Sequence, residues 1–182
     1  MPAPAEQTII VRPMIADDAE AVLRFARALP VHDQLFLRRD IRNARVVEAW
    51  ADKNAQGLIR TLVAVDGDRI VGCVALVRDA LSWSPHVVEL RVLVAPEIRG
   101  AGFGRKLAEE GFALALADGA EKVVVHLVPD QQAAVALFEE MGFRAEAMLR
   151  DHVRDAAGET HDLAILSLDV LRQGGQHSAY GL

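Results

Sequence analysis

The sequence predicts a mixed α/β fold, in which a mostly antiparallel sheet is built around a central strand-helix-strand-helix unit. Two observations predict it. Strand-like runs are joined by tight turns toward both ends of the chain, and between them apolar residues recur alternately at strand and helical spacing. A length of 182 residues corresponds to one domain. We assign residues 7–171 to it and expect residues 1–6 and 172–182 to be flexible ends.

The sequence of the first part of the domain predicts a short strand followed by two helices. Residues 8–11 are a β-rich run. Apolar residues over 19–29 recur at helical spacing, with Asp17 as the expected N-cap and Pro30 ending the helix. A second helix is expected over residues 43–57, after a polar connection.

Two hairpins are expected, one on each side of the central unit. Residues 58–65 and 70–77 are strand-like and are joined by Asp66-Gly67-Asp68, a sequence that readily supplies the positive φ of a tight turn. Residues 143–153 and 161–170 form the second pair. Both hairpins are antiparallel, so a doubly wound parallel sheet is not expected.

The central unit begins with a strand at residues 88–94. Its apolar residues alternate with Glu89 and Arg91, so one face belongs to the core and the charged face is free to line a cleft. A helix, a strand and a second helix are then expected over residues 103–114, 123–128 and 135–141.

Composition excludes several classes of protein. The formal net charge is -6 at pH 7, which argues against general attraction to nucleic acid or an anionic membrane. Apolar runs are far shorter than the ~20 residues that span a bilayer, and the N-terminus lacks the pattern of a secretory signal. The single cysteine, Cys73, cannot form an internal disulfide and fits a reducing compartment. We therefore expect a cytoplasmic protein, with Cys73 as a small buried residue.

A glycine-rich loop lies between the first central strand and its helix. It reads Arg99-Gly100-Ala101-Gly102-Phe103-Gly104, followed by Arg105 and Lys106. Glycines let backbone N–H groups approach an anion, and the helix N-terminus adds partial positive charge. The dinucleotide fingerprint and the P-loop pattern both fail, because each needs glycine where Arg105 or Leu107 stands. A turn that only caps the helix is the structural alternative.

This loop resembles the Arg/Gln-x-x-Gly-x-Gly/Ala pyrophosphate loop of the GNAT acetyltransferase superfamily. Residues 134–143 are similar to the family's A-x-x-L-Y/F-E-x-x-G-F helix, and the order of elements over residues 7–171 is that of the family fold. The resemblance implies an acyl-CoA-dependent N-acyltransferase. We expect it to transfer acetyl from acetyl-CoA to a primary amine of a small molecule or amino acid, by direct attack in a ternary complex.

The resemblance also implies a cofactor site made of one strand edge, the glycine loop and the last helix. Backbone groups of the strand would hold the pantetheine arm, and one N–H would hold the thioester oxygen. Many members carry Asn and Tyr where this chain has Gln131 and Phe138. Phe138 removes the usual proton donor for the thiolate, and core packing is its alternative role. The residues carried over are Val92, Leu93, Val94, Arg99, Gly100, Ala101, Gly102, Phe103, Gly104, Arg105, Lys106, Gln131 and Phe138.

Two residues are candidates for the catalytic base that deprotonates the amine. Glu89 lies on the charged face of the first central strand, and His126 lies on the next strand. The structural alternatives are a solvated strand carboxylate and a half-buried histidine.

Acceptor specificity is expected from the connection over residues 31–40, from Trp83 and from the last hairpin. Arg38 and Arg39 suit an acceptor carboxylate, or else form a solvated turn paired with Asp33 or Asp40.

No metal is expected. Histidine and aspartate residues gather in the last hairpin, but they fall on strands whose side chains alternate in direction. We assign them to the site rim, the acceptor pocket or a dimer contact. They are Asp151, His152, His161 and Asp162.

Two other functions stay open. One is acetylation of protein N-termini or lysines. The other is a CoA-binding sensor without catalysis, suggested by Phe138. A homodimer is expected because it is usual among members of the resembled family.

Overall fold

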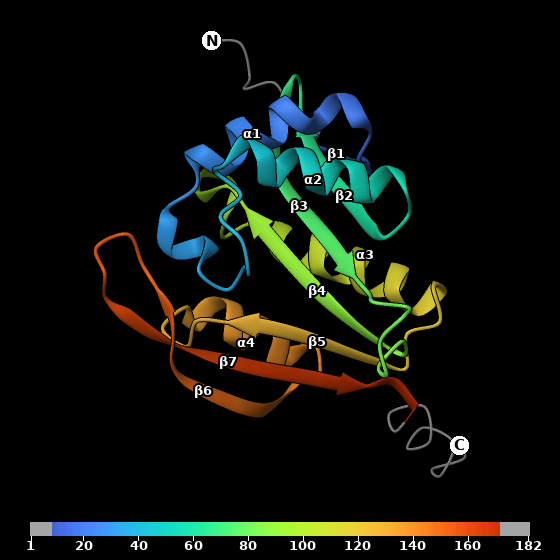
Figure 1. Cartoon of the computed structure of the whole chain (residues 1–182), viewed down its shortest axis with the longest axis vertical. Coiled ribbons are helices and arrows are strands. Elements are labelled where there is room, and N and C mark those ends of the chain that lie inside the picture. Colours follow the sequence, from blue (N-terminus) through green and yellow to red (C-terminus); the bar gives the residue numbers. More distant parts are fainter. Residues whose placement is uncertain (1–8, 172–182) are drawn as a thin grey trace.

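A single seven-stranded sheet forms the centre of the computed structural model, which describes residues 9–171. The strand order is β1-β2-β3-β4-β5-β7-β6. The β4–β5 pair is parallel, and every other neighbouring pair is antiparallel (Figure 1). The predicted mixed fold is confirmed. The expected flexible ends, residues 1–6 and 172–182, lie outside the described residues.

The elements follow the predicted order. The strands are β1 (Ile10–Pro13), β2 (Ile59–Asp66), β3 (Arg69–Val77), β4 (Val87–Val94), β5 (Lys122–Leu127), β6 (Arg144–Arg154) and β7 (Thr160–Asp169). The helices are α1 (Ala19–Ala28), α2 (Ala44–Ala55), α3 (Phe103–Ala117) and α4 (Gln132–Glu140). Three short 3-10 turns are η1 (Ala16–Asp18), η2 (Val31–Gln34) and η3 (Pro96–Ile98).

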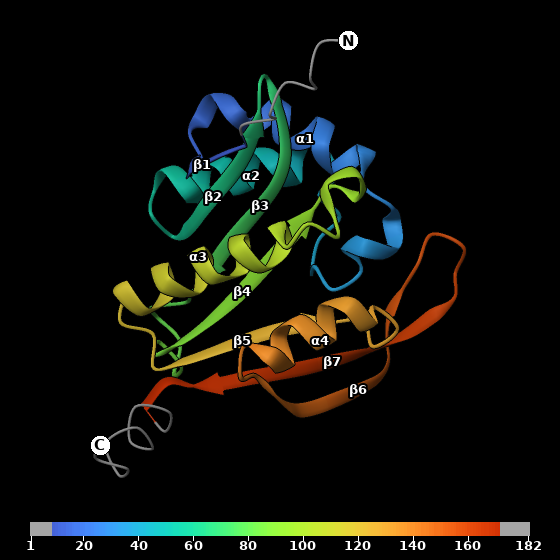
Figure 2. The same cartoon turned by 180° about the vertical axis from the view of Figure 1, so that it is seen from behind.

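Helices cover both faces of the sheet. Helices α1 and α2 pack on one face, and α3 and α4 pack on the other, as the two opposite views show (Figures 1 and 2). Each face has its own apolar cluster. Val22 and Val47 are buried in the first, and Leu107 and Phe143 in the second. The sheet therefore separates two cores, and a strand residue's face decides which core or site it joins.

The start of α1 differs from the prediction. Asp17 was expected to cap this helix, but the helix begins at Ala19 and Asp18 occupies the N-cap position. The Asp18 carboxylate accepts two hydrogen bonds from Arg12, at 2.7 and 2.8 Å, and one from the Ile15 N–H at 2.8 Å. The Arg12 hydrogen bonds lower the pKa of Asp18 against the effect of its burial. The prediction of Asp17 as the cap is wrong. Spacing along the chain could not show that residues 16–18 form a separate 3-10 turn before the helix.

The predicted start of the second helix near residue 43 and the predicted turn between β2 and β3 are confirmed. Asn43 caps α2, its side chain accepting a hydrogen bond of 3.0 Å from the Arg45 N–H. Gly67 and Asp68 are the two residues between β2 and β3, and Gly67 has a φ of 57°.

The parallel pairing of β4 and β5 is short. Its register is Val87 with Lys122, Val88 with Val123, and Glu89 with Val124. Beyond Glu89, β4 remains paired with β3 and β5 remains paired with β7, so the two strands diverge toward their carboxyl ends (Figure 1). This divergence leaves the second half of β4 with no strand partner on its β5 side.

Helix α3 crosses the back of the sheet at very close range. Gly111 is buried in its middle, and a Cβ placed there would lie 2.3 Å from a methyl carbon of Val74 and 2.9 Å from one of Leu90. Glycine at this position therefore allows the helix to approach β3 and β4, at the cost of a lower helix propensity.

We predict that Gly111→Ala destabilises the fold by about 1–3 kcal/mol, because the added methyl overpacks the contact with Val74 and Leu90. Urea unfolding followed by circular dichroism measures the effect. Gly104→Ala is the matched control in the first turn of the same helix, where the added carbon would lie 3.7 Å from Val94. The control should be neutral or slightly stabilising. Equal stability of the two variants would contradict the close approach.

Candidate active site

A cavity of about 710 Å³ opens on the face of the sheet that carries α1 and α2. Residues of α2, of the segment before it, of the β3–β4 connection and of strands β3, β4 and β5 line it. Trp83, predicted to contribute to acceptor specificity, is fully exposed, while its neighbours Ser82 and Ser84 line the cavity. The ionisable lining residues used below are Arg38, Arg39, Arg78, Glu89, Arg91 and His126.

Glu89 is a buried carboxylate held by a two-pronged ion pair. Arg91 donates to it from Nε at 2.8 Å and from Nη2 at 2.9 Å. Glu89 belongs to the last residue pair between β4 and β5, and its side chain lines the cavity. The residue is 9% exposed. Burial raises the pKa of Glu89. The hydrogen bonds from Arg91 and the nearby charges of Arg91, His126 and Arg38 lower it by more, so the pKa lies below its usual value. Glu89 is therefore ionised at neutral pH.

His126 lies beside Glu89. Its Nδ1 is 3.6 Å from Glu89 Oε1. Burial lowers the pKa of His126, Glu89 opposes this effect, and Arg38, Arg91 and His152 add to it, so the pKa falls below 6.5. His126 is consequently neutral at pH 7 and available to accept a proton. The two residues that the sequence suggested separately as bases are neighbours in the structure.

Several cations line the remainder of the cavity, together with the exposed carboxylate of Asp79. The predicted pairing of Arg38 or Arg39 with Asp33 or Asp40 is wrong, because Asp33 pairs with Arg99 at 2.6 Å and Asp40 pairs with Arg42 at 2.8 Å. Within the described residues, neither Arg38 nor Arg39 makes a hydrogen bond or ion pair. Both side chains line the cavity.

Arg78 is a third cation of the cavity wall that the sequence analysis missed. Its Nη1 donates to the backbone oxygen of Asp118 at 3.0 Å. Its Nε and Nη2 are buried without a hydrogen-bond partner. These two donors form one edge of the guanidinium, the edge that pairs with a carboxylate. Its position at the end of β3 gave no sequence signal for this role.

The glycine loop has the backbone geometry of an anion cradle. Gly100 and Gly102 have φ of 86° and 76°, in the left-handed region that favours glycine. A Cβ on either would have no atom within 4 Å, so the loop surface is open. Gly102 occupies the N-cap of α3, a helix of 15 residues whose first N–H groups have no partner within the helix.

The three cations predicted around this loop differ in their contacts. Arg99 donates to the Val94 carbonyl oxygen at 3.1 Å from Nε and 2.7 Å from Nη2, and it also pairs with Asp33. Arg105 pairs with Glu140. Lys106 is exposed. Two of the three are thus engaged within the protein, and Lys106 is the most accessible to an anion.

The two predicted cofactor residues of the last helix lie in different environments. Gln131 precedes α4, and its Nε2 lies 3.4 Å from the His32 backbone oxygen. Phe138 is 3% exposed and packs edge to face on Phe143, with ring centroids 5.3 Å apart. This burial supports the packing role of Phe138 rather than a contact with cofactor.

The hydrogen bonds of Asp151, Asp162 and His161 stay within the last hairpin. The Asp151 N–H donates to Asp162 at 2.9 Å, and the Thr160 hydroxyl donates to Asp151 at 2.8 Å. Among the described residues that line the cavity, none comes from this hairpin. His161 instead lies near His32 and Asp130, a juxtaposition that the sequence analysis missed because the three residues are far apart along the chain.

Cys73 is unsuited to be a nucleophile. It is 2% exposed, and burial raises the pKa of its thiol to about 12. At pH 8 roughly one molecule in 10⁴ carries the thiolate. The cysteine behaves as the small buried residue that was expected.

Comparison with known proteins identifies the family of this chain. The sequence profile described as "Acetyltransferase (GNAT) family" matches residues 21–143. The chain therefore belongs to the GNAT acetyltransferase family, as the loop and helix motifs indicated.

One sequence relative agrees with this assignment, and two solved structures share the fold. The mycothiol acetyltransferase of Geodermatophilus obscurus is 33% identical over 137 residues, covering 72% of this chain but 42% of the relative. The YncA protein of Salmonella typhimurium, solved with its cofactor acetyl-CoA, aligns with a TM-score of 0.72 at 19% identity, over 90% of this chain and 94% of that one. The spermidine/spermine N-acetyltransferase SpeG of Vibrio cholerae aligns with a TM-score of 0.73 at 19% identity, over 93% and 98% of the chains.

Membrane insertion through helices finds no support in the described part of the chain. None of its helices combines the length and the apolar character needed to cross a bilayer.

Proposed function

We propose that this protein transfers an acetyl group from acetyl-CoA to the primary amine of a small molecule that also carries a carboxylate, such as an amino acid. The proposal rests on the divergence of β4 from β5. Because of it, the backbone of β4 has an unpaired edge between the glycine loop and the cavity that holds Glu89 and His126. Membership of the GNAT family and the acetyltransferase relative support acetyl transfer.

The donor side of the reaction would use backbone groups. Val92, Leu93 and Val94 lie beyond the last β4–β5 pair, and the short turn η3 connects them to the glycine loop. The pantetheine arm would lie along this edge, with its diphosphate on the N–H groups of Gly100 to Gly104. A fixed N–H on the thioester oxygen stabilises the negative charge that develops there, by about 3 kcal/mol in comparable acyl transfers.

The acceptor side needs a neutral amine. At pH 7 deprotonation costs about 1 kcal/mol for an α-amine of pKa ~7.8, and ~4.6 kcal/mol for a lysine amine of pKa ~10.4. Neutral His126 accepts this proton, directly or through one water, while ionised Glu89 stabilises the resulting imidazolium. The amine nitrogen then bonds to the acetyl carbon as the carbon–sulfur bond breaks, and the nitrogen releases its second proton to water to give the neutral amide. Because Phe138 offers no proton, the thiolate takes one from water.

The charges of the cavity favour an acceptor with both an amine and a carboxylate. Glu89 attracts the ammonium form of the amine, and Arg38, Arg39 and Arg78 attract an anion. A volume of about 710 Å³ is typical of small-molecule sites.

Turnover of paired acceptors tests the proposal. The purified chain is given acetyl-CoA and amino acids, each compared with the amine that lacks the carboxylate, and free CoA and acetylated product are measured. We expect amino acids to react at least tenfold faster, about 1.4 kcal/mol of discrimination. Turnover of peptides alone would support a protein acetyltransferase, and CoA binding with no turnover would support a sensor. Failure to bind CoA would overturn all three functions.

We predict that His126→Gln lowers kcat by about 10²–10⁴-fold at pH 7. In the unchanged protein at saturating amine, kcat should rise with pH and level off below neutrality, because His126 must lose its proton and its pKa is lowered. In Glu89→Gln this rise should move to lower pH, since the carboxylate that raises the pKa of His126 is gone. His86→Gln, an exposed histidine outside the cavity, is the control. An unchanged pH profile in His126→Gln would exclude this base.

We predict that Gly102→Asp raises the KM for acetyl-CoA about tenfold or more, because it places a carboxylate where the diphosphate would lie. Gly119→Asp is a matched control at the other end of α3, with the same φ of 76° and open surroundings. Its KM should stay unchanged. Equal KM values in the two variants would show that the loop does not hold the diphosphate.

A further inference from the structure

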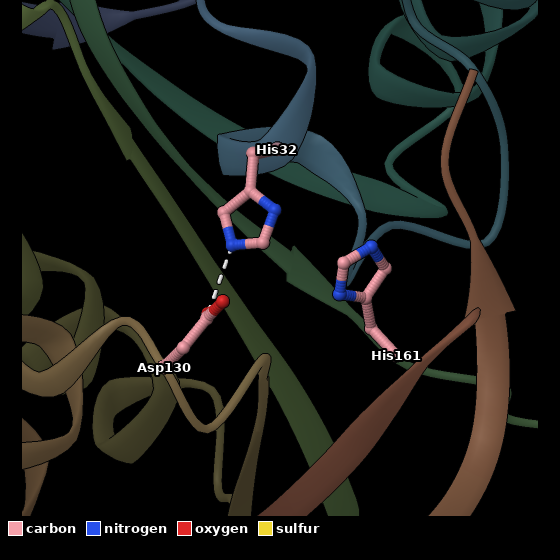
Figure 3. Close-up of side chains that lie close together, drawn as sticks. All are labelled: His32, Asp130 and His161. Carbon is pink, nitrogen blue, oxygen red and sulfur yellow. Dashed lines mark hydrogen bonds and ion pairs between the residues drawn. The ribbon is translucent and has the colours of Figure 1, made fainter. Parts of the chain in front are cut away.

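Two histidines and an aspartate converge outside the cavity, where three segments far apart in sequence meet. His32 belongs to η2, Asp130 to the turn between β5 and α4, and His161 to β7. One ligand atom of each lies within 4.8 Å of the others, and Figure 3 shows the three side chains pointing toward a common centre. His32 Nε2 is 2.8 Å from Asp130 Oδ1, and the two imidazole rings are 5.2 Å apart.

We propose that His32, Asp130 and His161 bind one divalent transition-metal ion, with Zn²⁺ as the ion that suits these donors. Zinc accepts imidazole nitrogen and carboxylate oxygen, and three protein ligands leave its fourth position to water. Bonds of about 2.0–2.1 Å place neighbouring ligand atoms about 3.3 Å apart. The three side chains are between 20% and 59% exposed, so side-chain rotation adjusts the present spacing to this value.

An outer hydrogen bond on His161 supports the assignment independently. Its Nε2 lies 2.9 Å from Asp155 Oδ2, which leaves Nδ1 facing His32 and Asp130 (Figure 3). Metal-binding histidines characteristically give their second ring N–H to a carboxylate, which fixes the tautomer and the ring orientation. Asp155 is itself held, since its Oδ1 accepts the N–H groups of Ala157 at 2.9 Å and Glu159 at 3.0 Å. The outer support of the site is already in place.

A bound ion would connect η2 to the β6–β7 hairpin and to the start of α4. The segment that follows η2 supplies Leu37, Arg38 and Arg39 to the cavity wall. Metal occupancy would therefore fix the base of the segment on which the acceptor cavity depends. The inference itself does not rest on acetyl transfer, because its residues and its test are separate from that reaction.

The test is a Zn²⁺ titration of the full chain without an affinity tag, after metal is removed, in competition with a chromogenic chelator. We expect one tight Zn²⁺ per chain. His161→Ala and Asp130→Ala should each weaken binding at least about 100-fold, and Asp155→Asn about 10–100-fold. His86→Ala changes an exposed histidine outside the cluster and should bind as the unchanged protein does.

Thermal unfolding supplies a second measurement. Zn²⁺ should raise the Tm of the unchanged protein and of His86→Ala, and leave that of His161→Ala unchanged, because an ion stabilises only a fold that binds it. Circular dichroism without metal checks that each variant folds. The site is overturned if the unchanged protein binds no Zn²⁺ at micromolar concentration, or if His161→Ala and Asp130→Ala bind it with unaltered affinity.

Discussion

The parallel pairing of β4 with β5 ends after three residue pairs, and the rest of the candidate site depends on this early end. β4 stays bonded to β3 as far as Val94, and β5 stays bonded to β7 as far as Leu127, so the strands diverge without leaving the sheet. Glu89 stands at the last pair and faces the cavity. The glycine loop begins after this strand, beyond the short turn η3. The carboxylate of the cavity, the open backbone edge and the loop thus follow one another along β4 and the segment after it.

The electrostatics of the cavity follow from burying one carboxylate among several cations. Arg91 offsets the cost of burying Glu89 through two charge-assisted hydrogen bonds, which hold the carboxylate ionised. The same burial and the same cations keep His126 neutral, although Glu89 acts in the opposite direction. His126, which can accept a proton, therefore lies next to the fixed negative charge of Glu89. Neither residue provides this combination alone.

Local patterns predicted most of the fold, and tertiary contacts explain what they missed. Asn43 and the Asp66-Gly67-Asp68 turn act within a few residues of themselves, so the sequence located them correctly. The cap of α1 was misplaced because Arg12 on β1 binds Asp18. Residue type and strand position pointed to Glu89 and His126 separately, but their proximity arises from strand pairing. His32, Asp130 and His161 are brought together only by the folded chain, and a single sequence carries no signal for such a meeting.

Arg99 connects the glycine loop to the segment that leads to the cavity. It binds the Val94 carbonyl oxygen and Asp33 of η2, so contacts within the protein hold the first residue of the loop. An anion that binds Arg99 must compete with Asp33 for the guanidinium. The free energy lost when the Arg99–Asp33 ion pair breaks then weakens the binding of the anion. Release of Asp33 would in turn loosen the hold on η2 and the residues after it. Any such effect would be reciprocal by thermodynamic linkage: a ligand in the cavity that favoured one position of η2 would change the affinity of the loop by the same factor.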